Sequence, residues 1–320
     1  MLSRHFLRVK VLQSLYAHKM ANNISLDIAE KELNKSILET YDLEVYLYSA
    51  LLEIRDIAEN QIENAKDKFF PTEEEKNPNM RFVNNELFRQ LSENIELKKA
   101  IENLKINWSE QKDMLKRVLN RFKDSNSYNE YMTKADLTYD DEKKVVVQLL
   151  KNYLLKNENF LDYLSELRLY WESDFQFIVL SFLKFIKEFK QTDGPAKSIV
   201  KTFDESEKGS RDFSIDLFRK CVTHYDEFDY LFEKHIENWD IDRLAFLDLL
   251  IIKMGVIELV YCPEVPIRVT LNEYIEMAKE FSTDRSKLFV NGLLDKFLID
   301  LRASGKIRKL ENEETESNNE

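Results

Sequence analysis

The scarcity of glycine and proline is the feature that most constrains the fold of this chain. Only five glycines and five prolines occur in 320 residues. Hairpin turns, bulges and glycine-rich loops depend on these residues, whereas long helices are interrupted by them. Hydrophobic residues make up 43% of the chain and charged residues 33%, enough to give helices both apolar and polar faces. We therefore predict an all-α protein with a sizeable core.

Charge and cysteine content limit the classes of function. The net charge of −12 excludes a protein that coats nucleic acid by bulk charge, so any nucleic-acid site must be local. Cys221 and Cys262 form no CxxC pair, which fits a reducing compartment. The N-terminus lacks the pattern of a secretory signal, and the apolar run at 247–262 is interrupted by Lys253 and Glu258. We expect a cytoplasmic protein without membrane contact.

Breaker-rich stretches divide the chain. Two prolines and an acidic cluster at 69–80, and a Gly-Pro pair within 191–198, interrupt the apolar periodicity, and we interpret the first stretch as a linker between packed units. The last residues are basic and then acidic, which is typical of a disordered tail. The expected parts are N-terminal helices, a helical insertion, C-terminal helices and the tail, at 1–68, 69–205, 206–304 and 305–320.

Apolar residues at intervals of three and four predict the individual helices outside the insertion. The expected helices lie at 3–20, from Ser25 onward, and at 42–64, 211–236, 239–259, 270–281 and 285–302.

No pattern indicates an enzyme. The glycines are isolated, so no loop cradles a phosphate, a dinucleotide or a methyl donor. Cys221 and His224 share one helical face, but two further metal ligands would have to come from elsewhere. Carboxylates are too abundant for one acid/base pair to be singled out. We expect no catalysis, no cofactor and no metal.

The N-terminus is the one locally basic part of this acidic chain. The first twenty-six residues contain Arg4, Arg8, Lys10, Lys19 and two histidines, and no Asp or Glu. Arg4 and Arg8 lie along one side of the predicted helix, where we expect them to project past the core. Arginines placed in this way can bind phosphates or stack on RNA bases, and the alternative is an ordinary solvated helix start.

A second basic run lies at 115–124, within the predicted insertion. It could extend a path for RNA. Lysines and arginines that alternate with acids on a helix are more often a solvated face, and both interpretations stay open at this point.

The run at 272–298 resembles the NusB family. Asn272, Glu273, Phe281, the Phe-Val-Asn-Gly of 289–292 and the Leu-Asp-Lys of 294–296 match that family's signature, and 1–65 and 206–302 match it in order. Within the signature, residues 289, 293 and 297 have core spacing, and Gly292 suggests a close approach of two helices.

The resemblance implies two packed helical bundles that bind a single-stranded boxA-like RNA with the ribosomal protein NusE, in the transcription elongation complex on ribosomal RNA operons. Phe6 falls where the family often has arginine, so the basic patch is thinner than usual. The RNA-binding residues implied by the resemblance and the basic N-terminus are Arg4, His5, Arg8, Tyr16, Lys19 and Asn291, and Asp248 is the residue expected near NusE.

Two other functions remain open. A helical scaffold could have kept the fold and lost RNA binding. A relative of the ribosomal RNA cytosine methyltransferases that carry a NusB-like domain would need a cofactor loop and a cysteine motif, and neither is found. Members of the family can also form homodimers that hide the RNA site.

Overall fold

The computed structural model describes residues 3–21, 24–200, 208–235 and 245–307. All regular secondary structure in these ranges is helical, which confirms the all-α prediction. None of the helices described is long and apolar enough to cross a membrane. The chain divides into two compact units, one formed by residues 1–37 and 203–320 and the other by 38–202.

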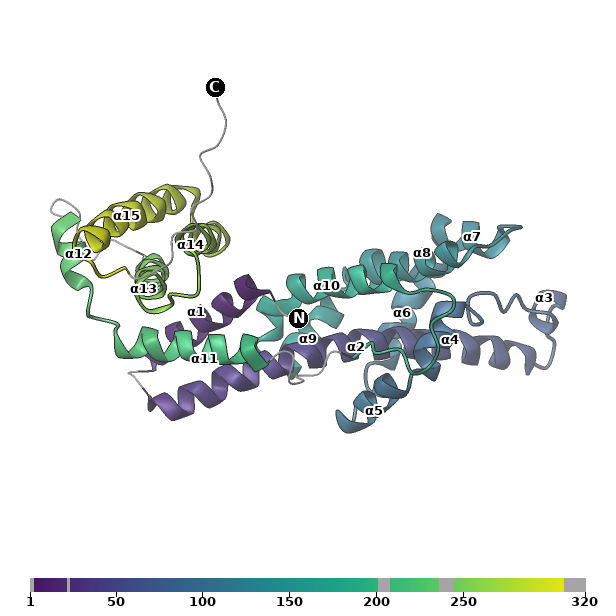
Figure 1. Ribbon diagram of the computed structural model, residues 1–320. Coiled ribbons are helices and arrows are strands. Elements are labelled where there is room, and N and C mark those ends of the chain that lie inside the picture. Colours follow the sequence, from purple (N-terminus) through teal and green to yellow (C-terminus); the bar gives the residue numbers. More distant parts are fainter. Residues whose placement is uncertain (1–2, 22–23, 201–207, 236–244, 308–320) are drawn as a thin grey trace, which may run out of the picture. The chain divides into compact units, whose positions relative to one another are not determined.

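The first unit is built around a nearly all-apolar helix, α13 (Phe246–Tyr261), whose residues 250–259 are all buried. A helix that is apolar on every side must be surrounded, and α13 packs against α1, α11, α14 and α15. Figure 1 shows α13 between these neighbours. The other helices of the unit are α1 (Arg4–Met20), the start of α2 (Leu26–Lys66), α11 (Lys208–Thr223), α12 (Asp229–His235), α14 (Ile267–Phe281) and α15 (Asp284–Ala303).

Gly255 on α13 allows this helix to pack closely against α14 and α15. A Cβ atom added at Gly255 would lie 3.0 Å from Leu294 Cδ2 and 3.3 Å from the ring of Tyr274. The close approach expected at Gly292 is wrong, because a Cβ there would meet nothing within 4 Å. In the same signature Phe297 is fully buried, as expected, whereas Phe289 is only half-buried.

The second unit has a single hydrophobic core that runs from Leu43 to Ile199. Helices α2 and α10 (Trp171–Glu188) lie side by side in it (Figure 1). The rings of Tyr48 and Phe182 are 4.4 Å apart. The remaining elements are α3 (Glu73–Lys76), α4 (Glu86–Glu93), α5 (Ile95–Asn103), α6 (Lys112–Lys123), α7 (Asn126–Thr133), α8 (Tyr139–Leu149), the π-helix η1 (Leu150–Leu154) and α9 (Glu158–Leu167).

Helix boundaries depart from the expectation at two places. Where two helices were expected from Ser25 to residue 64, α2 is one continuous helix, because no residue near position 40 interrupts it. The single helix expected at 211–236 is divided by a turn between Thr223 and Asp229. Residues 239–244 of the next expected helix, and 308–320 of the expected tail, lie outside the described residues.

The segment 69–80 does not separate the two units. It contains the short helix α3 and lies inside the second unit, because the apolar side chains of α2 beyond residue 42 belong to that unit's core. The chain passes between the units at 37/38 and at 202/203. This division describes packing. It does not test whether 69–205 was inserted relative to shorter proteins, so the insertion stays a prediction.

This division predicts where the chain can be cut. Replacing 38–202 by a flexible linker should leave a protein with one cooperative thermal transition, because each unit has its own core. Replacing 70–205 should instead give an aggregating protein, because it exposes the apolar side of α2 that includes Leu47, Leu51 and Ile54. Calorimetry and light scattering of both proteins measure this. If both deletion proteins unfold cooperatively, or if both aggregate, the division into these two units is wrong.

Candidate functional site

Arg8 lies in the interior of the first unit and does not project from it. Its Nε and Nη2 atoms each donate a 2.8 Å hydrogen bond to the carboxylate of Glu258 on α13, and both side chains are 0% exposed. Thr270 and Tyr274 of α14 donate two further bonds of 3.0 Å to this carboxylate. Burial lowers the pKa of Arg8, but the bonds and charge of Glu258 outweigh it, so the net pKa is raised.

The expectation that Arg8 projects toward RNA is therefore wrong. A carboxylate buried on α13 is costly without a counter-charge, and Arg8 is the residue of α1 that supplies one. The sequence contained a signal for this pairing. Glu258 lies within an apolar run, and an acid that is buried with such a run needs a basic partner. The guanidinium of Arg8 also donates to the backbone oxygen of Arg4 at 3.1 Å, which ties it to the first turn of α1.

The start of α1 has one exposed cation beside a half-buried histidine. Arg4 is exposed, and its guanidinium carbon lies 4.8 Å from the ring centroid of Phe213 on α11. His5 lies between two carboxylates, with Nδ1 3.0 Å from Glu273 and Nε2 3.2 Å from Glu280. These acids from α14 reduce the local positive charge, so Arg4 is the exposed cation that remains at this end of α1.

The other end of α1 combines an exposed aromatic ring with two lysines. Tyr16 is 43% exposed, and its ring lies 5.7 Å from that of Phe246. The ammonium group of Lys19 is 3.5 Å from the ring centroid of Tyr225, and that of Lys253 is 3.9 Å from the same centroid. Burial is the main cause that lowers the pKa of Lys19. The ring of Tyr225 thus holds two cations together.

Tyr225 and Lys253 belong to this cluster and were not predicted as site residues. Lys253 donates to the backbone oxygen of Tyr225 at 3.0 Å and pairs with Asp229 at 2.6 Å. A lysine within the apolar run of α13 was the available signal, because a buried ammonium group requires acceptors. Arg4 and Tyr16 lie twelve residues apart on α1, about 18 Å along the helix. The predicted residues of α1 therefore form two groups.

Asp248 and Asn291 lie on other helices. Asp248 is in the first turn of α13, two residues after the Phe246 that contacts Tyr16. It is 3% exposed, and its Oδ1 atom has no hydrogen-bond partner among the described residues. Asn291, on α15, is half-buried and donates a long bond of 3.4 Å to Asp295. No described contact joins Asn291 to the cluster at Tyr16.

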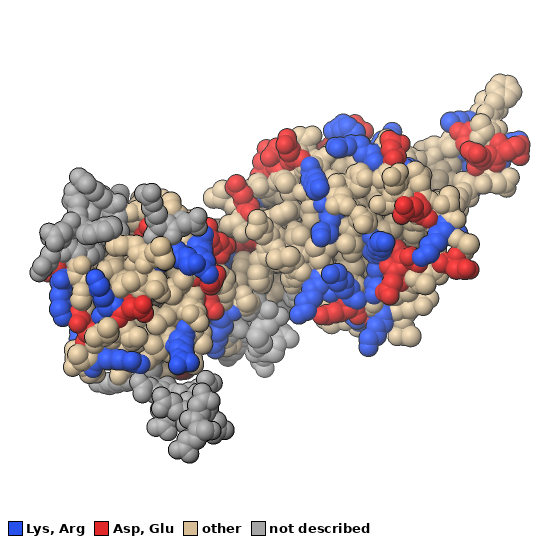
Figure 2. All heavy atoms as spheres, turned by 90° about the horizontal axis from the view of Figure 1, so that it is seen from above, with Lys and Arg blue, Asp and Glu red and all other residues tan. Residues whose placement is uncertain are grey.

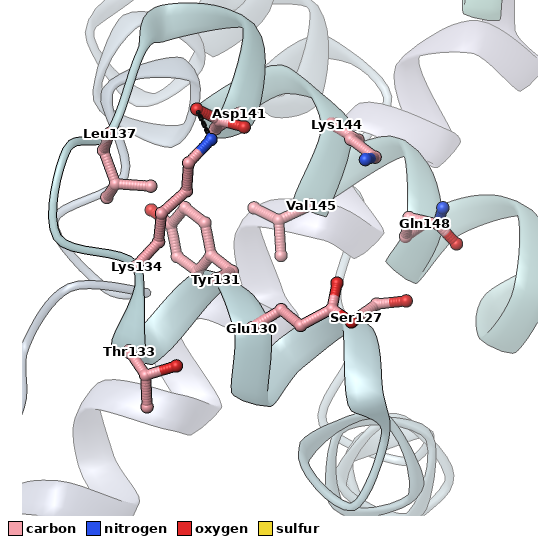
Figure 3. A pocket seen from close by; sticks show the side chains of 10 residues that line it. All are labelled: Ser127, Glu130, Tyr131, Thr133, Lys134, Leu137, Asp141, Lys144, Val145 and Gln148. Carbon is pink, nitrogen blue, oxygen red and sulfur yellow. Dashed lines mark hydrogen bonds and ion pairs between the residues drawn. The ribbon is translucent and has the colours of Figure 1, made fainter.

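A pocket between α7 and α8 in the second unit is accounted for by local structure (Figure 3). Lys134 pairs with Asp141 at 2.6 Å, and Asp141 also completes the cap of α8 with Thr138. The hydroxyl of Tyr131 donates to Glu142 at 2.9 Å, and burial raises the Tyr131 pKa. These side chains stabilise the α7–α8 turn, so the pocket carries no functional assignment.

The described residues contain no group of three or more His, Cys, Asp or Glu side chains that could hold a metal ion. Cys221 is buried, and His224 stacks on the ring of Tyr261 with centroids 3.9 Å apart. Burial raises the pKa of Cys262 to about 12, which keeps this thiol protonated and unreactive at neutral pH.

The first unit is thus a helical unit with the Arg8–Glu258 ion pair in its core and with aromatic and basic side chains on α1. A family model described as the NusB family matches residues 175–298, from α10 to α15. The match begins inside the stretch expected to be an insertion, and it does not include α1. No solved structure matches the chain.

Curated relatives establish the family. A protein of Salinibacter ruber is 40% identical over 124 residues, which cover 38% of this chain and 78% of the relative. One of Myxococcus xanthus is 39% identical over 31% of this chain and 72% of its own length. One of Chloroherpeton thalassium is 31% identical over a stretch that covers 38% of this chain and 57% of the relative. All three are named transcription antitermination protein NusB. The chain belongs to the NusB family.

The Arg8–Glu258 pair predicts a difference in stability between two arginines of α1. Arg8→Met leaves a buried carboxylate without its counter-charge and should lower the free energy of unfolding by about 3–5 kcal/mol. Arg4→Gln changes an exposed side chain and should cost less than about 0.5 kcal/mol. Urea unfolding followed by circular dichroism measures both. An Arg8→Met protein as stable as Arg4→Gln would contradict the placement of Arg8.

Proposed function

We propose that this protein is an RNA-binding transcription antitermination factor. It binds a boxA-like single-stranded RNA together with the ribosomal protein NusE and acts, within the transcription elongation complex, on ribosomal RNA transcription in the cytoplasm. The observation that carries the proposal is membership of a family whose curated relatives bear the name of this activity. The protein acts by presenting a surface, without catalysis or a cofactor.

The cluster around Tyr16 supplies the chemistry for this role. An exposed aromatic ring can stack on an unpaired base, and the nearby Lys19 can bind an adjoining phosphate. Arg4 offers a further phosphate contact at the other end of α1. Asp248, in the first turn of α13 and with one buried oxygen lacking a partner among the described residues, is our proposed contact for NusE.

Binding to a short boxA-like RNA tests the proposal. Fluorescence anisotropy with a 12-nucleotide single strand, with and without NusE, should give saturable binding that NusE strengthens. Tyr16→Ala with Lys19→Gln should weaken binding about tenfold, because one base stack is worth about 1–3 kcal/mol. Lys35→Gln, an exposed lysine of the same unit, removes equal charge elsewhere and is the matched control.

Light scattering on the same samples reports whether a homodimer forms and hides the surface. Absence of binding by the monomeric wild-type protein with NusE present would overturn the proposed function. Equal affinity of the Tyr16/Lys19 variant and the Lys35 control would overturn the assignment of the site.

A further inference from the structure

Helix α6 in the second unit is held firmly by its apolar side. The ring centroid of Phe122 on α6 lies 5.2 Å from that of Tyr153 in η1 and 5.9 Å from that of Phe82. Lys123 donates to Gln61 of α2 at 2.6 Å, and Gln61 donates to Asn120 at 3.2 Å. The buried residues are Met114, Leu115, Val118, Leu119 and Phe122. The opposite face is therefore presented on a rigid support.

That opposite face holds arginines without partners. The arginines of the second unit are Arg55, Arg81, Arg89, Arg117, Arg121 and Arg168. Arg55, Arg89 and Arg168 pair with carboxylates, and Arg81 donates to three backbone oxygens. Arg117 and Arg121 are exposed, and no hydrogen bond or ion pair joins them to a described residue. They lie one turn apart on α6, so the two unpartnered guanidinium groups of this unit are neighbours.

Arg117 and Arg121 differ in this respect from the other four arginines of the second unit, which all have partners. In Figure 2 lysines and arginines are intermixed with aspartates and glutamates over the visible surface. On α6, Asp113 precedes Arg117 by one turn and Asp124 follows Arg121, but neither carboxylate lies within 4 Å of a described cation. Like charges one turn apart destabilise a helix by about 0.2–0.5 kcal/mol. The helix dipole favours cations in the last turn only. It therefore gives no reason for the positive charges of Lys116 and Arg117 in the middle of α6.

We propose that the exposed face of α6, formed by Lys116, Arg117 and Arg121, is a second binding surface for the phosphate backbone of single-stranded RNA. This inference rests on the proposed function and adds to it a contact outside the family's first-unit site. Guanidinium groups bind phosphates through paired hydrogen bonds, and unpaired arginines are free to do so. The surface adds phosphate contacts made by the second unit.

The residue types on this face favour RNA over a protein partner. The exposed residues of α6 are all charged or polar: Lys112, Asp113, Lys116, Arg117, Asn120 and Arg121. A stable protein interface has an apolar or aromatic centre, and this face has none. Contacts with a phosphate backbone need only cations at suitable spacing. The surface should consequently be independent of RNA sequence.

Two RNA lengths separate this surface from the first site. The probes are the 12-nucleotide boxA-like strand and a 40-nucleotide single strand that contains it, each measured with NusE over a range of salt. The full-length variant is Arg117→Gln with Arg121→Gln. Lys98→Gln with Lys99→Gln, two exposed lysines of α5, is the control with the same change in charge. Circular dichroism establishes that each variant is folded.

For the long RNA, the α6 variant should bind three- to tenfold more weakly than the α5 control. Its slope of log affinity against log salt should fall by about 1.4, for the loss of two phosphate contacts at about 0.7 each. Affinity for the short RNA should be unchanged, and Arg117→Lys with Arg121→Lys should restore part of the long-RNA affinity.

Two results would overturn the inference. If the wild-type protein binds both RNAs and the α6 variant matches the α5 control, the second surface is wrong while the proposed function stands. If the wild-type protein binds neither RNA, the proposed function fails and the second surface with it.

Discussion

The buried pairing of Arg8 with Glu258 is the interaction on which the first unit depends. It joins α1 to α13, elements 250 residues apart in the sequence, and Thr270 and Tyr274 bring α14 onto the same carboxylate. A buried charge is tolerated when its hydrogen bonds are complete, and four donors meet this carboxylate. Because a guanidinium has a fixed fork geometry, the pair also fixes the rotation of α1 about its own axis.

That rotation decides which cations of α1 reach solvent. With Arg8 turned inward, Arg4 is exposed at one end and Tyr16 at the other, where Lys19 rests on the ring of Tyr225. The positive charge of the N-terminus is therefore divided between a structural and a surface role. An exposed aromatic ring beside a lysine can bind single-stranded RNA through both stacking and charge.

Much of the fold followed from the sequence, because apolar periodicity without breakers specifies helices directly. The helices at 3–20, 270–281 and 285–302 agree closely with α1, α14 and α15. Apolar periodicity could not show which residues far apart in the sequence contact one another. Arg8 resembled a surface residue because Glu258, its partner, is 250 positions away. Tyr225 and Lys253 were missed for the same reason, and the close approach at Gly255 was not predicted because packing between helices leaves no local pattern.

The central claim is that Arg8 is structural while the cluster at Tyr16 meets RNA. Ultraviolet cross-linking of the folded protein, with NusE, to a boxA-containing RNA, followed by mass spectrometry at residue resolution, tests this claim most directly. The account predicts RNA adducts at Tyr16 and Lys19 and none at Arg8, which lies out of reach at 0% exposure. An adduct at Arg8, with Tyr16 and Lys19 unmodified, would contradict it.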